Sequence, residues 1–448
     1  MKKFFTTLSN IWKIEDLRVR ITNTLLFLLI YRVGSYVVLP GVDANVLNAQ
    51  QGKEGLLGLL NMFAGGSFSR ASIFALGVMP YISASIVMQL LGIAVPYFTK
   101  MQKEGESGRN KINQWTRYMT IFITAAQAVG YVRSQIPANG HLMTDPYFTV
   151  LTTLTLTAGT LFVMWLGEKI TDKGIGNGIS LIIMVGIISS LPGAIGSEFS
   201  DKIIGTGGGP IFFIVELVAL MVVVMFTILI VQGTRKVAVQ YAKRIVGNKQ
   251  YGGVRQYIPL KVTAAGVMPI IFAQALMFIP ATIGSFFPKV ASSSIVIALS
   301  NYTTWQHNLV FAILIILFTF FYTAITVNPT QMADDMKKNN GFIPGVKPGQ
   351  ATSSFLDGVI SKITLPGSIF LAIIAIIPAF ANMAHINSQF ARFFGGTSLI
   401  ILVGVVLDTL QQIESHLLMR HYDGLMKTGR IKGRSAVPTA AGTTPPAI

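Results

Sequence analysis

The chain of 448 residues contains no cysteine, which excludes disulfide bonds, thiolate nucleophiles and cysteine-ligated metal centres. Charged residues are scarce too: they make up 12% of the chain, about half the share found in soluble domains, whereas 52% of residues are hydrophobic. The mean hydropathy is +0.59. So little charge indicates an integral membrane protein whose apolar surface faces lipid.

Recognisable catalytic motifs are absent as well. The sequence has no phosphate-binding lysine loop, no His-Glu-x-x-His zinc motif and no serine elbow, and its five histidines are scattered. We therefore expect no enzyme activity, no metal and no cofactor. The ionisable residues within apolar stretches, Arg32, Glu216 and Asp408, are isolated from one another, and we interpret them as structural partners of neighbouring helices rather than as a proton relay. The sequence favours a protein that provides a passive path across the membrane, with the driving force for transport supplied by another component.

Ten apolar stretches are long enough to cross a membrane, which takes roughly 20 helical residues. An even count places both termini on one side. Most of the 35 basic residues fall on that side, and the opposite segments hold only six, which predicts cytoplasmic termini. The start of the chain is basic, but residues 6–20 are amphipathic, so we expect a retained surface helix rather than a signal peptide. The ten predicted spans are 22–39, 72–95, 116–136, 148–167, 178–196, 210–232, 262–287, 307–327, 364–384 and 395–412.

Five predicted spans precede a glycine-rich connection and five follow it, so the second half enters the membrane with the opposite polarity. This arrangement predicts an inverted repeat. The expected parts are an N-terminal half at 1–196, a connecting loop at 197–209, a C-terminal half at 210–420 and a partly disordered cytoplasmic tail at 421–448.

The tetrapeptide Gly-Val-Met-Pro occurs in both halves, at 77–80 and 266–269, in the second span of each. Seven of ten positions agree between residues 75–84 and 264–273. The match could arise by chance in a chain rich in these residue types. If it reflects a repeat, proline-interrupted helices at corresponding positions are expected to line the functional centre.

A short apolar segment, Leu56 to Phe63, precedes the second span and covers only about 12 Å as a helix. Gly65 and Gly66 follow and permit a hinge before a span expected to begin at Ala71. The segment is either an interfacial helix or a re-entrant segment sheltered by protein. The second span itself is rich in small and weakly polar residues, which suit either close packing or a seam that opens.

Two long loops are predicted on the cytoplasmic side. Residues 233–261 carry seven basic residues and no acidic one, and their pattern predicts a β-hairpin turning near Gly247-Asn248. Such a surface suits RNA phosphates or an acidic protein face, although control of topology or adhesion to anionic lipids explains the charge equally well. Residues 328–363 contain closely spaced Pro-Gly turns, which predict a rigid, presented loop.

Several motifs together resemble the SecY and Sec61 alpha family of protein-conducting channels, and bacterial members most closely. They are Asn61 to Gly66, Ser69 to Ile86, Lys103 to Arg109, Gly174 to Ser180 and Gly395 to Leu399. The resemblance covers nearly the whole chain. It implies an all-α integral membrane fold of ten transmembrane helices in two inverted halves, with a clamshell shape, an hourglass pore, a plug helix and a lateral gate.

The resemblance also assigns residues to these parts. The lateral gate would lie between the second and third spans on one side and the seventh and eighth on the other. The pore ring would comprise Val78, Ile82, Ile179, Ile183, Ile271 and Ile401, the plug Leu56, Leu57, Leu60, Asn61, Met62, Phe63, Gly65 and Gly66, and the gate Ile86, Gln89, Gln127 and Gln274.

The function that the resemblance implies is passage of unfolded polypeptides across the bacterial cytoplasmic membrane, with sideways release of transmembrane segments into lipid. Expected partners are the SecE and SecG subunits, the SecA motor ATPase, the ribosome, the translocated polypeptide and membrane lipids. Docking is expected at Lys243, Arg244, Arg255 and Lys347. The family usually has arginine in place of Lys347, so a bidentate contact would become a point charge. The loops at 198–210 and 288–307 are less recognisable, so the resemblance assigns them no role.

Two other functions fit parts of the pattern. A secondary transporter shares inverted repeats and broken helices, but would show a polar site or a coupling ion at the membrane midplane. A scaffold that anchors ribosomes through its basic loops would need no movement of the segment before the second span.

Overall fold

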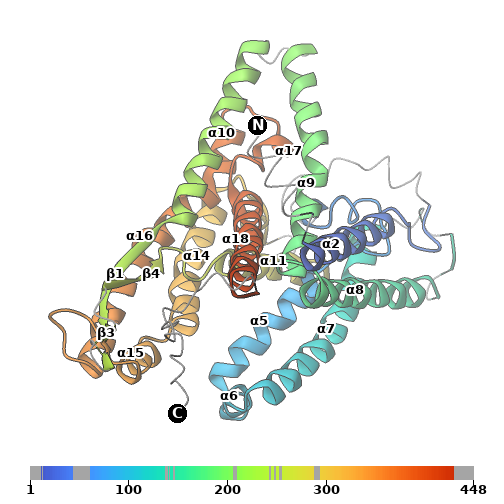
Figure 1. Cartoon of the computed structure of the whole chain (residues 1–448). Helices are drawn as coiled ribbons and strands as arrows, with labels where there is room; N and C mark the ends of the chain where they lie inside the picture. The colour runs from blue at the N-terminus through green and yellow to red at the C-terminus, as the bar shows by residue number, and fades with distance from the viewer. Residues whose placement is uncertain are drawn as a thin grey trace, which may run out of the picture.

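The computed structural model describes residues 12, 14–43, 61–136, 140, 142–144, 147–204, 209–241, 244–246, 249–251, 255–286 and 293–427. Most of these residues are helical (Figure 1). The helices before residue 205 are α2 (Glu15–Gly34), α5 (Met79–Ala94), α6 (Pro96–Lys103), α7 (Glu106–Gln135), α8 (Tyr147–Lys173), α9 (Gly178–Phe199) and the π-helix η2 (Ser200–Ile204). The later helices are α10 (Pro210–Gln232), α11 (Met268–Phe286), α13 (Ser294–Ser300), α14 (Trp305–Thr326), α15 (Pro329–Lys338), α16 (Gln350–Met383), α17 (Ser388–Ala391) and α18 (Gly396–Lys427).

Six of the described helical segments are long and apolar enough to cross a membrane, and a seventh is counted if α5 and α6, bent by 101°, form one span. The six contain α8, α9, α10, α14, α16 and α18. Each of the ten predicted stretches contains a helix, but α2 and α7 do not meet this measure and the apolar part of α11, Met268–Met277, is shorter. The structure therefore supports a multi-span membrane protein, and the count of ten remains a prediction.

The two Gly-Val-Met-Pro motifs start helices rather than interrupt them, so the predicted boundaries at 72 and 262 are wrong. Six turn residues precede α5 at Met79, and six precede α11 at Met268. Gly77 and Gly266 have φ values of 54° and 61°, a conformation that glycine adopts readily. The prolines then fall in the first helical turn, where the missing N–H breaks no hydrogen bond. Both copies share one backbone geometry, which supports the repeat.

Two other boundaries also differ from the sequence analysis. The first helix runs from Glu15 to Gly34 rather than over 22–39. The strand-like segment that follows it pairs Val38 with Ser72. The predicted rigid loop at 328–363 is largely helical, because α15 fills its first part and α16 already begins at Gln350. The early turns of α16 bury Thr352 and Leu356, which explains why they are helical and not loop.

The predicted hairpin is confirmed. Strand β1 (Thr234–Tyr241) pairs with β4 (Arg255–Lys261) in antiparallel register, and β2 (Arg244–Val246) pairs with β3 (Lys249–Tyr251) nearer the tip. The short strand β5 (Gly341–Phe342) adds to the other edge of β1, which gives the order β4-β1-β5. A small core lies under this sheet, formed by Val237, Val239, Leu260, Met336, Ile343 and Leu356. In Figure 1 the sheet and α15 lie at the end of the molecule away from α17.

One large cluster of buried side chains joins the two halves of the chain. It extends from Tyr31 on α2 to Val405 on α18 and takes residues from α5, α8, α9, α11, α14 and α16. Helix α10, in contrast, has only 11% of its apolar window buried, as expected of a helix in contact with lipid. The ring residues expected from the sequence lie in or beside this shared cluster.

Candidate functional site

Five of the six expected ring residues are buried, and all six meet in the large shared cluster. Val78, Ile82, Ile183, Ile271 and Ile401 expose 3%, 6%, 3%, 7% and 2% of their surface, and the half-buried Ile179 packs against the cluster that contains them. They come from the start of α5, from α9, from α11 and from α18. These elements touch one another directly, since α5 contacts α11, α11 contacts α18 and α18 contacts α9. Branched apolar side chains from both halves thus lie in one place.

The repeat places two of these residues equivalently. The backbone N–H of Ile82 donates to Val78 O at 3.1 Å, and that of Ile271 donates to Val267 O at 3.3 Å. Val267 is thus the counterpart of Val78, and it too packs against the cluster. A Cβ on Gly404 of α18 would lie 2.5 Å from the Val267 side chain. Sequence reasoning missed Val267 and Gly404, although the repeat itself could have indicated the valine.

The segment expected to act as a plug is described from Asn61 onward, whereas Leu56, Leu57 and Leu60 lie outside the described residues. Asn61 to Phe63 form a helical turn. Met62 and Phe63 are each 5% exposed and belong to the same buried cluster as the ring residues. The Met62 sulfur lies 4.0 Å from the Ser398 hydroxyl of α18. At the expected hinge, Gly65 and Gly66 have φ values of 63° and 84°, so both use the backbone freedom of glycine.

Two arginines hold the Gly65 carbonyl. Arg32 Nη1 on α2 donates to it at 2.8 Å, and Arg70 Nη2 donates to it at 2.9 Å. Both guanidinium groups also lie over the Tyr36 ring, at 4.8 and 4.4 Å from its centroid. Partial burial lowers the pKa of Arg70, and the neighbouring Arg32 charge acts in the same direction, yet a guanidinium remains protonated at neutral pH. Two charge-assisted hydrogen bonds thus converge on the hinge.

The same segment packs directly on the backbone of α9. A Cβ on Gly186 would lie 2.4 Å from the Phe63 carbonyl oxygen and 3.1 Å from the Gly65 nitrogen. Only a residue without a side chain allows this approach. The buried side chain of Tyr31 also contacts this segment, with its hydroxyl 3.5 Å from Ala64 O. The sequence analysis did not identify Gly186, because nothing in the sequence indicates which glycine meets a distant segment.

The expected gate residues come from the helices α5, α7 and α11. Both α5 and α7 touch α11, which in turn packs on α14. Ile86 is buried in the shared cluster, Gln127 is half-buried, and Gln89 donates to Ser85 Oγ at 3.3 Å. Gln274 is 3% exposed, and its Nε2 has no hydrogen-bond partner among the described residues. We term the contact of α5 and α7 with α11 the seam, and no ion pair crosses it among the described residues.

Of the expected docking residues, Arg255 and Lys347 are exposed. Arg255 starts β4 opposite Gln240, and Lys347 lies in a turn between Gly345 and Gly349, whose φ values are 86° and 96°. Arg244 begins β2, and Lys243 lies outside the described residues. Within the described part of the chain, no three His, Asp or Glu side chains are grouped so that they could hold a metal ion.

Of the isolated charges noted in the sequence, Glu216 does have a structural partner. Its carboxylate lies 2.9 Å from Lys202 Nζ, as expected for a structural pair. Asp408 is exposed on α18. Arg32, described above, donates to the hinge carbonyl and to the Tyr36 hydroxyl. The interpretation of Arg32 and Glu216 as structural partners is confirmed.

Comparisons with known proteins agree with this geometry. The chain is 42% identical to the protein translocase subunit SecY of Streptomyces scabiei and 43% identical to that of Bacillus subtilis, in each case over 94% of this chain and 100% of the relative. Solved structures share the fold at 17–18% identity, each over 89% of this chain and 92% of theirs. They are a protein-conducting channel with a TM-score of 0.62, a SecY channel described by its plug domain at 0.59, and Sec61 in a canine ribosome-channel complex at 0.59. The SecY family model matches residues 72–410, and the chain therefore belongs to the SecY family.

Proposed function

We propose that this chain is the central pore-forming subunit of a Sec protein translocase, through which unfolded polypeptides cross the bacterial cytoplasmic membrane. The relatives named above are protein translocase subunits. The observation that carries the proposal is the convergence of buried branched residues from α5, α9, α11 and α18 in one cluster that joins both halves. The chain is a channel subunit and not an enzyme.

The ring explains how such a channel works without recognising a sequence. A constriction of isoleucine and valine side chains excludes water and ions when empty. Those side chains make no directional bonds, so they can yield around any extended chain. The required selectivity is therefore against small ions, and an apolar ring supplies it.

The segment from Asn61 to Gly66 is proposed to be the plug that closes the ring. Met62 and Phe63 already lie in the ring's cluster, and the hinge carbonyl of Gly65 is held by Arg32 and Arg70. Moving the plug aside breaks these two bonds and separates the Phe63 backbone from Gly186. The left-handed conformations of Gly65 and Gly66 put the bend at this point.

The seam between α5 and α7 on one side and α11 and α14 on the other is the proposed lateral gate. No ion pair crosses this seam among the described residues. Opening it therefore leaves no charged side chain without its partner. An apolar segment inside the channel could then exchange contact with Ile86 for contact with lipid, whereas a polar segment would remain in the channel.

The hairpin β1–β4 and the turn around Lys347 are the proposed docking surface in the cytoplasm, where both termini would also lie. Arg244, Arg255 and Lys347 suit the phosphates of ribosomal RNA or an acidic surface of the SecA motor. One structural relative is seen in a ribosome-channel complex. The lipid-facing helices leave room for the smaller SecE and SecG subunits that the family implies.

The proposal is tested with a stalled secretory chain and photo-crosslinking probes at Ile82 and Ile271. We expect both probes to label the chain. Matched control probes are placed at Leu90 on α5 and Leu276 on α11, which are 41% and 40% exposed and should label lipid instead. Equal labelling at all four positions, or none at the two isoleucines in an active complex, would contradict the pore assignment.

A further inference from the structure

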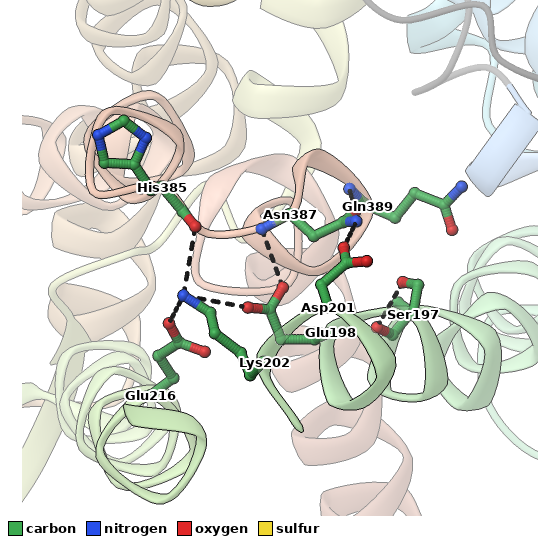
Figure 2. A network of polar contacts seen from close by, with 9 residues as sticks. Ser197, Glu198, Asp201, Lys202, Glu216, His385, Asn387 and Gln389 are labelled. Carbon is green, nitrogen blue, oxygen red and sulfur yellow. Dashed lines mark hydrogen bonds and ion pairs between the residues drawn. The ribbon is translucent and has the colours of Figure 1, made fainter. Parts of the chain in front are cut away.

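Three charged side chains are buried together where α9, η2 and α10 meet (Figure 2). Glu198, Lys202 and Glu216 expose 0%, 7% and 8% of their surface. Lys202 Nζ lies 2.9 Å from Glu216 Oε1 and 3.6 Å from Glu198 Oε1. One ammonium group thus lies between two carboxylates and attracts both. Within the described residues, Glu216 Oε2 has no hydrogen-bond partner, so Lys202 is what compensates this carboxylate.

The loop between α16 and α17 binds to the same charges. Lys202 Nζ donates to His385 O at 3.3 Å, and the backbone N–H of Asn387 donates to Glu198 Oε2 at 2.9 Å. The Asn387 side-chain amide donates to Asp201, while its carbonyl oxygen accepts from the Gln389 N–H at 2.9 Å. His385 itself has a φ of 61°, so the turn is held in a conformation that a non-glycine residue rarely adopts. Figure 2 shows Lys202 at the centre of this arrangement.

These residues lie on both sides of the connection between the two halves. Glu198 ends α9, which carries Ile179 and Ile183, and Lys202 lies in the connection itself. Glu216 is on α10, the first helix of the second half. The loop at 385–387 leads through α17, which packs on α9, to α18 and Ile401. The charges therefore join the C-terminal part of α9 to the loop that leads to α18, and both α9 and α18 contribute residues to the ring.

Separation of the halves is harder here than at the seam. Removing one partner from a buried ion pair leaves an uncompensated charge, which is strongly unfavourable. At the seam, no ion pair joins α5 or α7 to α11 among the described residues, and Nε2 of Gln274 on α11 is already unpaired. A force that parts the halves would thus open the seam first and leave the charged contact closed.

From this asymmetry we propose that Lys202 is a positioning residue: it forms a clasp with Glu198, Glu216 and the loop at 385–387 that keeps α9, α10 and α17 together while the seam opens. The clasp deepens the proposed channel function, on which it rests. It acts on the ring through α9 and α18 rather than by touching the polypeptide.

The first test replaces Lys202 by methionine, which keeps the stem and removes the charge. We expect the resting ion permeability of proteoliposomes to rise severalfold at equal amounts of folded protein, because the two carboxylates repel and the ring loses alignment. The exchange Lys202→Glu with Glu216→Lys should restore most of the seal. Lys338→Met, which removes an exposed pair with Asp335 at 3.6 Å, serves as the control and should change nothing. Wild-type permeability in Lys202→Met would overturn the proposal.

The second test replaces the ion pair by a covalent link. Cysteines at positions 202 and 216 are joined by a short bismaleimide in this chain, which has no native cysteine. If the clasp stays closed during transport, the joined protein should seal and translocate as well as the wild-type chain. Loss of translocation on joining would show that the contact must open, and would overturn the proposal. Failure of the wild-type chain to translocate would instead contradict the proposed function.

Discussion

At the scale of single residues, the proposed plug packs against α9 at a position where only glycine fits. The glycine at 186 brings the α9 backbone against Phe63 and Gly65, where a Cβ would lie 2.4 Å from a carbonyl oxygen. Gly193 on the same helix has nothing within 4 Å of its Cβ position. Two glycines of one helix therefore have different roles, and a pair of identical substitutions separates them.

We predict that Gly186→Ala displaces the plug, at a cost of about 1–3 kcal/mol for overpacking. Gly193→Ala should be neutral or stabilise α9 by up to about 1 kcal/mol, since alanine favours helix. A cysteine introduced at Met62 reports the change: its labelling by a water-soluble maleimide should speed up in Gly186→Ala and stay slow in Gly193→Ala. Equal labelling rates would place the plug seat elsewhere.

The arginines at the hinge lead to a second prediction at this scale. Arg32→Met or Arg70→Met removes one charge-assisted bond to the Gly65 carbonyl, worth about 1.5–3 kcal/mol. Each variant should raise the resting ion conductance in planar bilayers, and the pair should raise it less than additively, because both bonds end on one oxygen. The exposed Arg133 provides the control as Arg133→Met. Strictly additive effects would indicate that the two arginines act on different elements.

At the scale of elements, the sequence predicted helix positions and the hairpin well, because hydropathy and turn residues determine them locally. The predicted helix boundaries were wrong where contacts with residues far along the chain determine them. Two prolines were expected to interrupt spans, but left-handed Gly77 and Gly266 place each of them at a helix start. Helix α16 begins at Gln350 because Leu356 finds buried partners on β1 and β4, and no local pattern indicates those partners.

That small core makes the hairpin testable as an element. Leu356 is fully buried beneath the sheet, so Leu356→Ala should destabilise it by about 2–5 kcal/mol. We expect faster proteolysis within 233–261 and weaker binding of ribosomes or the motor, although no basic residue has changed. Phe355→Ala alters a neighbouring side chain that is 40% exposed and should leave the proteolysis rate unchanged. A Leu356→Ala hairpin as resistant as the wild type would mean that the sheet does not rest on α16.

At the scale of the whole molecule, the site combines residues that the chain order keeps far apart. The ring positions of Ile82 and Ile271 came from the family resemblance, and the repeat agrees with them because it gives these two residues equivalent positions in the two halves. The positions on α9 and α18 came only from the family resemblance. The pairing of Lys202 with Glu216 and with the loop at 385–387 could not be foreseen, since it joins the connection to elements far along the chain. On the proposal above, the buried charges around Lys202 hold one contact between the halves while the other parts at the seam.

The balance between closed and parted states should respond to Gln274. Its buried Nε2 lacks a partner in the described structure, and such a group costs about 1–3 kcal/mol. Gln274→Leu should therefore favour the closed seam, with about a tenfold shift in the closed-to-open ratio for each 1.4 kcal/mol. We expect slower translocation and less membrane insertion of marginally apolar segments, measured with wild-type levels of protein. Gln89→Leu provides the matched control: it removes a satisfied amide, whose Nε2 donates to Ser85, and should shift the balance little or toward opening. Faster insertion in Gln274→Leu would show that this amide finds its partner in the closed state and stabilises it.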